Sequence, residues 1–272
     1  MPKLSKKDQF IDLSDYGRPA AVLIANQFKD SKLTPIHVTF LFTISGLLAV
    51  LSILLGYYLT AALYLILKSI LDAADGELSR VKDSPSYTGR YLDSISDIIL
   101  NFLIIMVIGY ESNISVYYSL LAFLAIQFQG TLYNYYYVIL RHNSFSADVT
   151  SRVFESKTPK AMAGEKQRNV NLLFKVFRIL YGAFDNIIYR LDKTASQIKS
   201  FPNWFMTLVS LYGLGFQLII TSIMLFLNLI DYIIPFFIYY TALIPLIVII
   251  RKYFLINSLY NSKLIEHTLE KS

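Results

Sequence analysis

The sequence contains no cysteine, and this absence excludes disulfide bonds, thiolate zinc sites and cysteine nucleophiles. Charged residues are also scarce: they make up 16% of the 272 residues, whereas 55% are hydrophobic and the mean hydropathy is +0.48. A typical soluble domain carries about 25% charged residues. The composition therefore predicts a protein whose solvent is the lipid bilayer.

The basic residues separate long uncharged runs, so the net charge of +6 does not indicate a nucleic-acid-binding protein. We expect anionic lipid headgroups or phosphorylated substrates as partners instead. A helix rises about 1.5 Å per residue and the hydrocarbon core is about 30 Å thick, so about 20 residues cross it. The charge gaps predict six transmembrane helices, at 36–57, 60–80, 91–110, 115–140, 204–229 and 232–250.

The lysines and arginines predict the orientation of these spans. All but Lys68, which lies inside the second span, fall in residues 1–34, 76–91 and 141–203 or after residue 250. Basic residues are enriched on the cytoplasmic side of membrane proteins. We therefore expect both termini in the cytoplasm, in a multi-pass protein of the cytoplasmic (inner) membrane.

Two further segments have the pattern of helices that lie flat on the cytoplasmic leaflet. Residues 19–29 follow a helix-starting proline, and residues 169–190 carry apolar side chains on one face and basic ones off it. The predicted fold is thus an all-α integral membrane protein with six transmembrane helices and cytoplasmic interfacial helices. Its parts are a cytoplasmic segment (1–34), spans one to four (35–140), a second cytoplasmic segment (141–203), spans five and six (204–254) and a cytoplasmic tail (255–272). Within the second cytoplasmic segment, residues 141–168 are predicted to be loop and the rest contains the amphipathic helix.

Four aspartates lie at the cytoplasmic ends of spans two and three. Asp72, Asp75, Gly76 and Ser79 recur at i, i+3, i+4 and i+7 on one helix face, and Gly89, Asp93 and Asp97 recur at i, i+4 and i+8 on the other. Because the two spans are antiparallel neighbours, the two stripes can face each other across a cavity. Acids inside a membrane are functional by default.

Oxygen ligands without cysteine favour a hard cation, Mg²⁺ or Mn²⁺. Two such ions offset four carboxylates, and a pair about 3.5–4 Å apart is suited to clamp a diphosphate, with Arg80 and Lys82 left to meet the phosphates. The alternative is a buried ion-pair network in which Lys68, Arg80 and Arg90 neutralise some of the aspartates.

The motif D-x2-D-G-x2-S-R-x8-G-x3-D-x3-D, from Asp72 to Asp97, resembles the signature of the CDP-alcohol phosphotransferases. Every spacing agrees, and the one departure is Ser79, where alanine is usual. The stretch from Arg18 to Thr39 also resembles the region before the first span of these enzymes. It has Ile36 where they often have asparagine.

The resemblance implies a membrane enzyme that joins a CDP-alcohol donor to an acceptor alcohol and releases CMP. Asp72, Asp75 and Asp93 would hold two Mg²⁺ or Mn²⁺ ions, with Asp97 completing the shell and acting as general base. Gly76, Ser79, Arg80 and Gly89 would line the CDP pocket, and the active site would face the cytoplasm. CDP-diacylglycerol is the expected donor, in phospholipid biosynthesis. A CDP-linked choline, ethanolamine or inositol with a lipid or sugar acceptor is the alternative.

The sequence also offers candidates for the acceptor site and for the oligomeric state. Lys82, Arg141 and Arg152 are the basic residues that could bind an acceptor phosphate, and Gln127, Gln129 and Gly130 fit an acceptor contact or hydrogen bonds between helices equally well. A homodimer is compatible with the chain. A distant alternative is an ion-coupled transporter, but the outer halves of the first three spans are nearly all apolar and offer no polar path. A catalytically silent member of the same fold is the third alternative.

Overall fold

The computed structural model describes residues 4–144, 155–198 and 200–253. Every regular element in these residues is helical, with no strand, which confirms the all-α prediction. The elements, with η for a 3₁₀-helix, are η1 Lys6–Asp8, α1 Arg18–Phe28, α2 Pro35–Leu54, α3 Tyr58–Val81, α4 Tyr87–Glu111, α5 Val116–Ser144, α6 Gln167–Leu191, η2 Lys193–Gln197, α7 Asn203–Ser210, α8 Leu214–Phe226 and α9 Ile230–Thr241.

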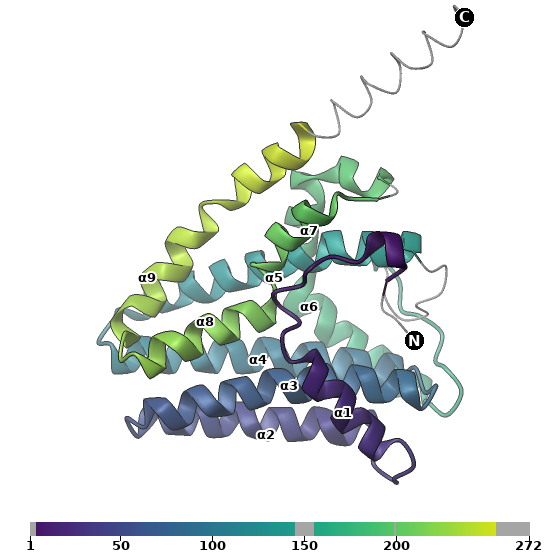
Figure 1. The fold of residues 1–272 in the computed structure, drawn as a ribbon, viewed down its shortest axis with the longest axis horizontal. Coiled ribbons are helices and arrows are strands. Elements are labelled where there is room, and N and C mark those ends of the chain that lie inside the picture. The colour runs from purple at the N-terminus through teal and green to yellow at the C-terminus, as the bar shows by residue number, and fades with distance from the viewer. Residues whose placement is uncertain (1–3, 145–154, 199, 254–272) are drawn as a thin grey trace, which may run out of the picture.

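Three tight connections lie together at one end of the bundle: those between α2 and α3, between α4 and α5, and between α8 and α9 (Figure 1). Each contains one residue with positive φ, namely Gly56 (73°), Asn113 (52°) and Asn228 (56°). Glycine and asparagine adopt this left-handed conformation at the lowest cost. The chain can therefore reverse within a few residues, which makes the joined helices antiparallel neighbours.

Length and apolar composition allow three helical segments to cross a membrane: α2, α4 and Ile230–Tyr253, which continues α9. The bent pair of α7 and α8 adds a fourth if it counts as one span. The other two predicted spans correspond to α3 and α5, which have 24 and 29 residues. Both are long enough to cross, but α3 contains the charged residues of the aspartate stripe and α5 is rich in tyrosine and glutamine.

The apolar residues divide between the bundle interior and its outer surface. Side chains from α2, α3, α4, α5, α8 and α9 form the main core. Five of them are at most 2% exposed: Phe42, Leu65, Ile105, Leu225 and Phe237. On α2 the outward side chains Phe40, Ile44 and Leu51 are about half exposed. A helix that is apolar on all sides belongs in lipid or in a large core.

The span predicted over 204–229 is not a single straight helix in the structure. The helix breaks between α7 and α8, whose axes differ by 47°. The N-terminal segment lies at the break: the amide of Gly215 donates to Ser14 Oγ (3.0 Å), and that of Leu13 donates to Ser210 Oγ (3.0 Å). A Cβ on Gly215 would lie 1.8 Å from the carbonyl oxygen of Ser14. Glycine thus admits the segment, and Ser14 supplies a partner for an N-terminal amide of α8.

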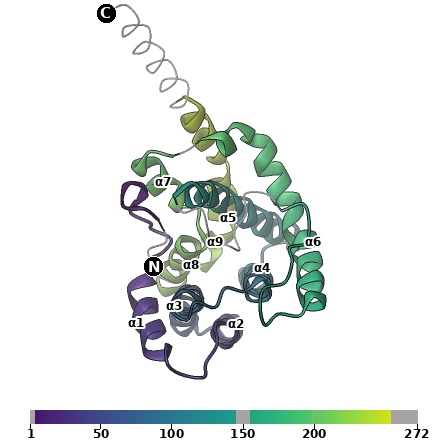
Figure 2. The same cartoon turned by 90° about the vertical axis from the view of Figure 1, so that its right-hand side faces the viewer.

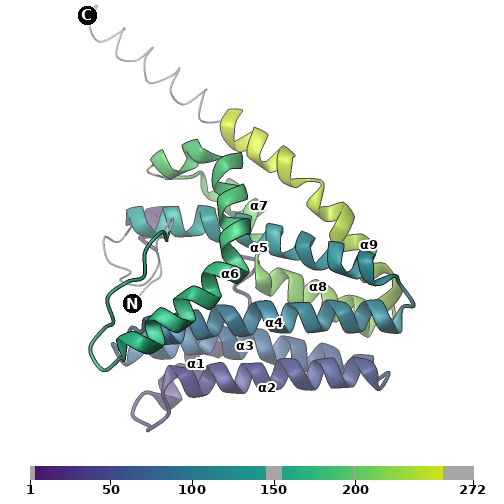
Figure 3. The same cartoon turned by 180° about the vertical axis from the view of Figure 1, so that it is seen from behind.

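The two predicted amphipathic helices are present as α1 and α6, and both lie on the outside of the bundle (Figure 2). Helix α6 crosses α4 and α5 (Figure 3). Val170 and Phe174 on its apolar face pack against Tyr87 and Tyr91 of α4. The segment 141–168 is not all loop as predicted, because α5 continues to Ser144; residues 145–154 lie outside the described residues.

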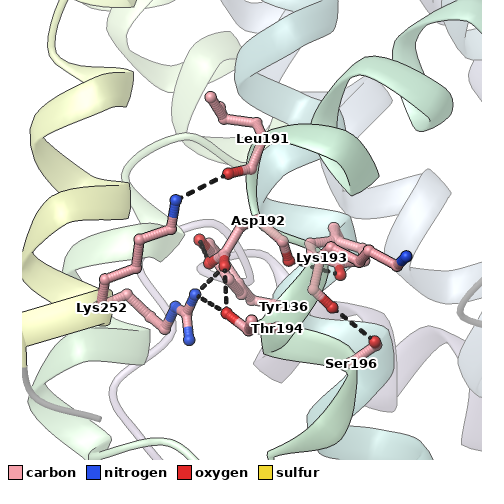
Figure 4. A network of polar contacts seen from close by, with 9 residues as sticks. Tyr136, Leu191, Asp192, Lys193, Thr194, Ser196 and Lys252 are labelled. Atoms are coloured by element: carbon pink, nitrogen blue, oxygen red, sulfur yellow. Dashed lines mark hydrogen bonds and ion pairs between the residues drawn. The ribbon is translucent and has the colours of Figure 1, made fainter. Parts of the chain in front are cut away.

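A buried ion pair fastens the end of α6 to α5 and to the end of the last helix (Figure 4). Asp192 is fully buried, pairs with Arg251 and accepts a hydrogen bond from the Tyr136 hydroxyl (2.8 Å). The same Arg251 donates to Thr194 Oγ1 (2.7 Å), and the Lys252 ammonium donates to the carbonyl of Leu191 (3.1 Å). These contacts hold α6, and thereby one wall of the cavity described next, in place.

Candidate active site

A cavity of about 2100 Å³ opens at the end of the bundle away from the three tight connections. Its walls are the start of α2, the second half of α3, the first half of α4, and parts of α5, α6 and α8. The residues predicted for the metal ions and CDP all line it: Asp72, Asp75, Gly76, Ser79, Arg80, Gly89, Asp93 and Asp97. The two helix faces predicted to meet across a cavity therefore do so.

Three of the four aspartates converge. One carboxylate oxygen from each of Asp72, Asp75 and Asp93 lies within 4.8 Å of the others. Asp75 is 9% exposed and accepts a hydrogen bond from Thr39 Oγ1 of α2 (2.8 Å), whereas Asp93 Oδ1 is buried without a hydrogen-bond partner. Like charges at this spacing repel, and a buried unpartnered carboxylate oxygen needs an explanation. Three oxygen donors of this kind fit a hard divalent cation.

The fourth aspartate has a different partner. The Lys68 ammonium is fully buried, contacts Asp97 Oδ1 and lies 3.5 Å from Asp72 Oδ2. Lys68, Asp97 and Asp72 thus form an ion-pair network of the kind predicted as the alternative to a metal site. Arg80 instead pairs with Glu77 (2.8 Å) and Arg90 with Glu155, so neither cation pairs with the aspartates in the contacts described. Among the ion pairs of the described residues, Lys68 is the cation that contacts this group of four carboxylates, through Asp97 and Asp72, and this leaves excess negative charge.

The loop between α3 and α4 is braced by residues of the motif itself. Ser79 Oγ donates to the carbonyl of Ser84 (3.0 Å) rather than to the i−4 carbonyl of its own helix, and Ser79 still lines the cavity. The Lys82 ammonium donates to the carbonyls of Ser31 and Leu33 (2.7 Å each). Lys82 therefore joins this loop to the segment between α1 and α2.

Glu165 binds the N-terminus of α4 from the segment before α6. It accepts hydrogen bonds from the Ser86 hydroxyl (2.8 Å) and the Thr88 amide (2.6 Å), while Ser86 Oγ caps the helix at Gly89 (2.9 Å). Burial acts to raise the pKa of Glu165, but the hydrogen bonds from Thr88, Met162 and Ser86 outweigh it and lower that pKa below its ordinary value. An anionic side chain at a helix N-terminus is also favoured by the helix dipole.

On α6, Asp185 lines the cavity. Burial, together with the Glu155 carboxylate, raises the pKa of Asp185 to about 6, against the opposite effect of Arg90. The α6 wall thus adds a further carboxyl group to an already acidic cavity.

Of the three basic residues predicted to bind an acceptor phosphate, two lie in the cavity wall. Lys82 and Arg141 line the cavity, and Arg152 lies outside the described residues. Several cavity residues had no predicted role: Thr39 as a partner of Asp75, Glu165 at α4, and Asn101 and Thr131 deeper in. Asn101 could have been found, since it continues the spacing of Asp93 and Asp97 by one turn. Glu165 could not, because no spacing relates it to the motif.

Comparison with known proteins agrees with this geometry. The family model described as CDP-alcohol phosphatidyltransferase matches residues 32–183, which include the whole aspartate motif and all of α2 to α5. Searches of curated proteins and of solved structures gave no match.

Proposed function

This chain belongs to the CDP-alcohol phosphatidyltransferase family, and from that premise we propose that it transfers a phosphatidyl group from CDP-diacylglycerol to an acceptor alcohol in phospholipid biosynthesis. The family relationship itself implies transfer of a phosphate-bearing group from a CDP-alcohol to an alcohol. The observation that supports a working site is the convergence of Asp72, Asp75 and Asp93, with Asp97 beside them. A chain without catalysis has no need to keep four acids in a membrane bundle.

In the proposed site, Asp72, Asp75 and Asp93 hold two Mg²⁺ or Mn²⁺ ions, with Asp97 completing the shell, and Gly76, Ser79, Arg80 and Gly89 bind CDP. The bound ions would polarise the attacked phosphorus and neutralise the departing phosphate. Arg80 reaches the same cavity while it pairs with Glu77, which Arg18 also contacts (3.1 Å). Thr39 and Glu77 thereby position ligands and cation before substrate binds.

Asp97 acts as the general base. It takes the proton of the acceptor hydroxyl; the resulting oxygen forms a bond to the β-phosphorus of the donor, and the bond from that phosphorus to CMP breaks. Because Lys68 engages Oδ1 of Asp97, Oδ2 is the oxygen that receives the proton. The lysine also fixes the direction of the carboxylate, which is the usual role of a second group behind a catalytic base.

The proposal includes the orientation. Helices α2, α3, α4, α5, the bent pair α7 and α8, and the last helix form six spans, with both termini and the cavity facing the cytoplasm. Supporting this, the three short connections that share one end of the bundle lack lysine and arginine, and the cavity lies at the basic end. Helices α1 and α6 then lie in the cytoplasmic interface.

The test is CMP release by the purified full chain in nanodiscs, followed by mass spectrometry over a matrix of donors and acceptors with Mg²⁺, Mn²⁺ or EDTA. We expect CMP with CDP-diacylglycerol and a divalent ion, and none with EDTA. Asp97→Asn should abolish turnover and leave donor binding largely intact. Asp231→Asn is the matched control, because that residue is exposed at the opposite end of the bundle.

A folded protein that yields no CMP with any donor and acceptor would contradict the proposal. CMP only from a CDP-linked small alcohol with a lipid or sugar acceptor would reverse the roles of donor and acceptor. Cation-driven uptake into proteoliposomes without CMP release would instead favour the transporter.

A further inference from the structure

One wall of the cavity has no role in the scheme above. Helix α5 presents Gln127, Gly130, Thr131 and Asn134 to the cavity, at i, i+3, i+4 and i+7. This spacing is one helix face. These four residues are uncharged, and α5 packs against α4, which carries Asp93 and Asp97. The cation of the same face, Arg141, lies ten residues beyond Thr131, about 15 Å further along the helix.

Two buried polar groups of this face lack partners. Gln127 Nε2 and Thr131 Oγ1 are buried without a hydrogen bond, and the two residues are 4% and 6% exposed. Gln129, which points to a neighbouring helix, is by contrast satisfied by the carbonyl of Phe237 (3.1 Å) and by Thr241 Oγ1 (2.7 Å). The bundle therefore pairs the glutamine that faces protein and leaves unpaired the groups that face the cavity. Buried polar groups without partners are rare and mark a place for water or a ligand.

The pairing of α4 with α5 shows which aspartate these groups are near. The two antiparallel helices touch at Gly109 and Ser119, and further along at Phe102 and Phe123, whose ring centroids are 5.3 Å apart. Asp97 lies twelve residues before Gly109, and Thr131 lies twelve after Ser119. Asn101 and Gln127 each lie eight residues from the same contact. The Gly109–Ser119 contact places Thr131 level with Asp97 and Gln127 level with Asn101. The Phe102–Phe123 contact shifts this register by three residues, so Asp97 lies level with the stretch 128–131 of α5.

We infer that Thr131, Gln127 and Asn101 form the acceptor subsite and that the acceptor part bound there is an uncharged group with several hydroxyls. The inference rests on the proposed function, in which Asp97 takes the proton of the acceptor. The reacting hydroxyl must then lie beside Asp97, and the rest of the acceptor extends over the α5 wall. A Cβ added to Gly130 would meet no atom within 4 Å, so the wall has open space at this point.

The chemistry of the three side chains indicates which class of acceptor the subsite binds. Amide and hydroxyl groups donate and accept hydrogen bonds, as the hydroxyls of a polyol do, so a polyol can satisfy both kinds. A simple alkyl alcohol leaves the buried groups unpaired, and sites built to bond a hydroxyl discriminate strongly against ligands that lack it. The three side chains are neutral, so they offer an anionic group no counter-charge.

The experiment compares 1-propanol, glycerol and myo-inositol as acceptors for CDP-diacylglycerol, with CMP release as the readout. In the wild type, kcat/KM should rise with the number of hydroxyls. Thr131→Val should raise the KM for the preferred polyol about tenfold, which corresponds to about 1.4 kcal/mol, with the KM for the donor unchanged. Gly130→Leu should fill the open space and abolish use of the polyols.

Thr221→Val is the matched control: its hydroxyl donates within α8 to the carbonyl of Gln217 (2.8 Å), and it does not line the cavity. Its KM for the polyol should equal that of the wild type. Thermal unfolding checks that each variant is folded. An active wild type with equal use of propanol and polyols, or α5 variants with unchanged acceptor KM, overturns the subsite and leaves the proposed function standing.

A binding measurement separates the two proposals. Scintillation proximity with tritiated myo-inositol and CMP, without donor, should show binding to the wild type and to Thr221→Val and none to Gly130→Leu. This pattern supports the subsite even if no CMP is ever released, in which case the proposed function fails alone. No difference among these proteins means that water fills the α5 wall, and the subsite is refuted.

Discussion

Lys68 offers the sharpest test of how the charges of the site are balanced. Its side chain is 0% exposed and its ammonium serves both Asp97 and Asp72. Removing one partner of a buried ion pair costs about 3–5 kcal/mol, because the other charge stays buried without compensation. Lys68→Met keeps most of the side-chain volume and removes only the charge. We therefore expect its free energy of unfolding in EDTA to fall by about that amount.

Divalent cations should restore part of this loss. The variant has one positive charge fewer among four carboxylates, so the stabilisation by Mg²⁺ or Mn²⁺ should be larger in Lys68→Met than in the wild type. The assay is thermal unfolding of full-length protein in detergent, with EDTA and with a series of metal concentrations. Lys82→Met is the control, since that ammonium binds only carbonyl oxygens in the contacts described and its loss should not depend on metal.

A second substitution tests whether the buried charge of Asp97 causes the loss of stability. Asp97→Asn placed in Lys68→Met removes the uncompensated charge, so the double variant should be more stable in EDTA than Lys68→Met alone. Two results would refute the reasoning: a Lys68→Met protein as stable as the wild type in EDTA, or an identical metal response in both proteins.

Three further outcomes are expected. Glu165→Gln should lower the thermal stability above about pH 5, because the pKa of Glu165 is lower in the folded than in the unfolded protein. The difference in stability from the wild type should shrink as the pH falls through the unfolded-state pKa near 4.5, and it should vanish below the folded-state pKa. Gly46→Val should cost about 1–3 kcal/mol of unfolding free energy, since even a Cβ would lie 2.6 Å from Leu100 on α4, whereas Gly182→Ala on the open face of α6 should be neutral or stabilising by up to about 1 kcal/mol. Asp192→Asn should cost about 3–5 kcal/mol in chemical unfolding because it leaves the Arg251 charge buried, and an unchanged midpoint would contradict the role of this network.

Much of the bundle follows from local sequence. The run without charge that became α2 and the apolar face of α6 each depend on neighbours a few residues away, and each lies within a few residues of its prediction. The break between α7 and α8 combines a local feature, the glycines at 213 and 215, with a distant one. It depends on Ser14, about 200 residues earlier in the chain, which approaches at Gly215.

The site shows the same division. The spacing from Asp72 to Asp97 places the acids on two helix faces, and the turn between antiparallel helices brings those faces together, so the sequence alone determined the family, the all-α class and the composition of the acidic cluster. Only the tertiary structure decided which acid has which partner: Lys68 for Asp97, Thr39 for Asp75, and none for Asp93 Oδ1. The physical reason is the distance along the chain over which each interaction acts. Helical periodicity fixes the direction of a side chain within its own helix, whereas its partner depends on how separate helices pack, and the unpaired groups on α5 become visible only after that packing is known.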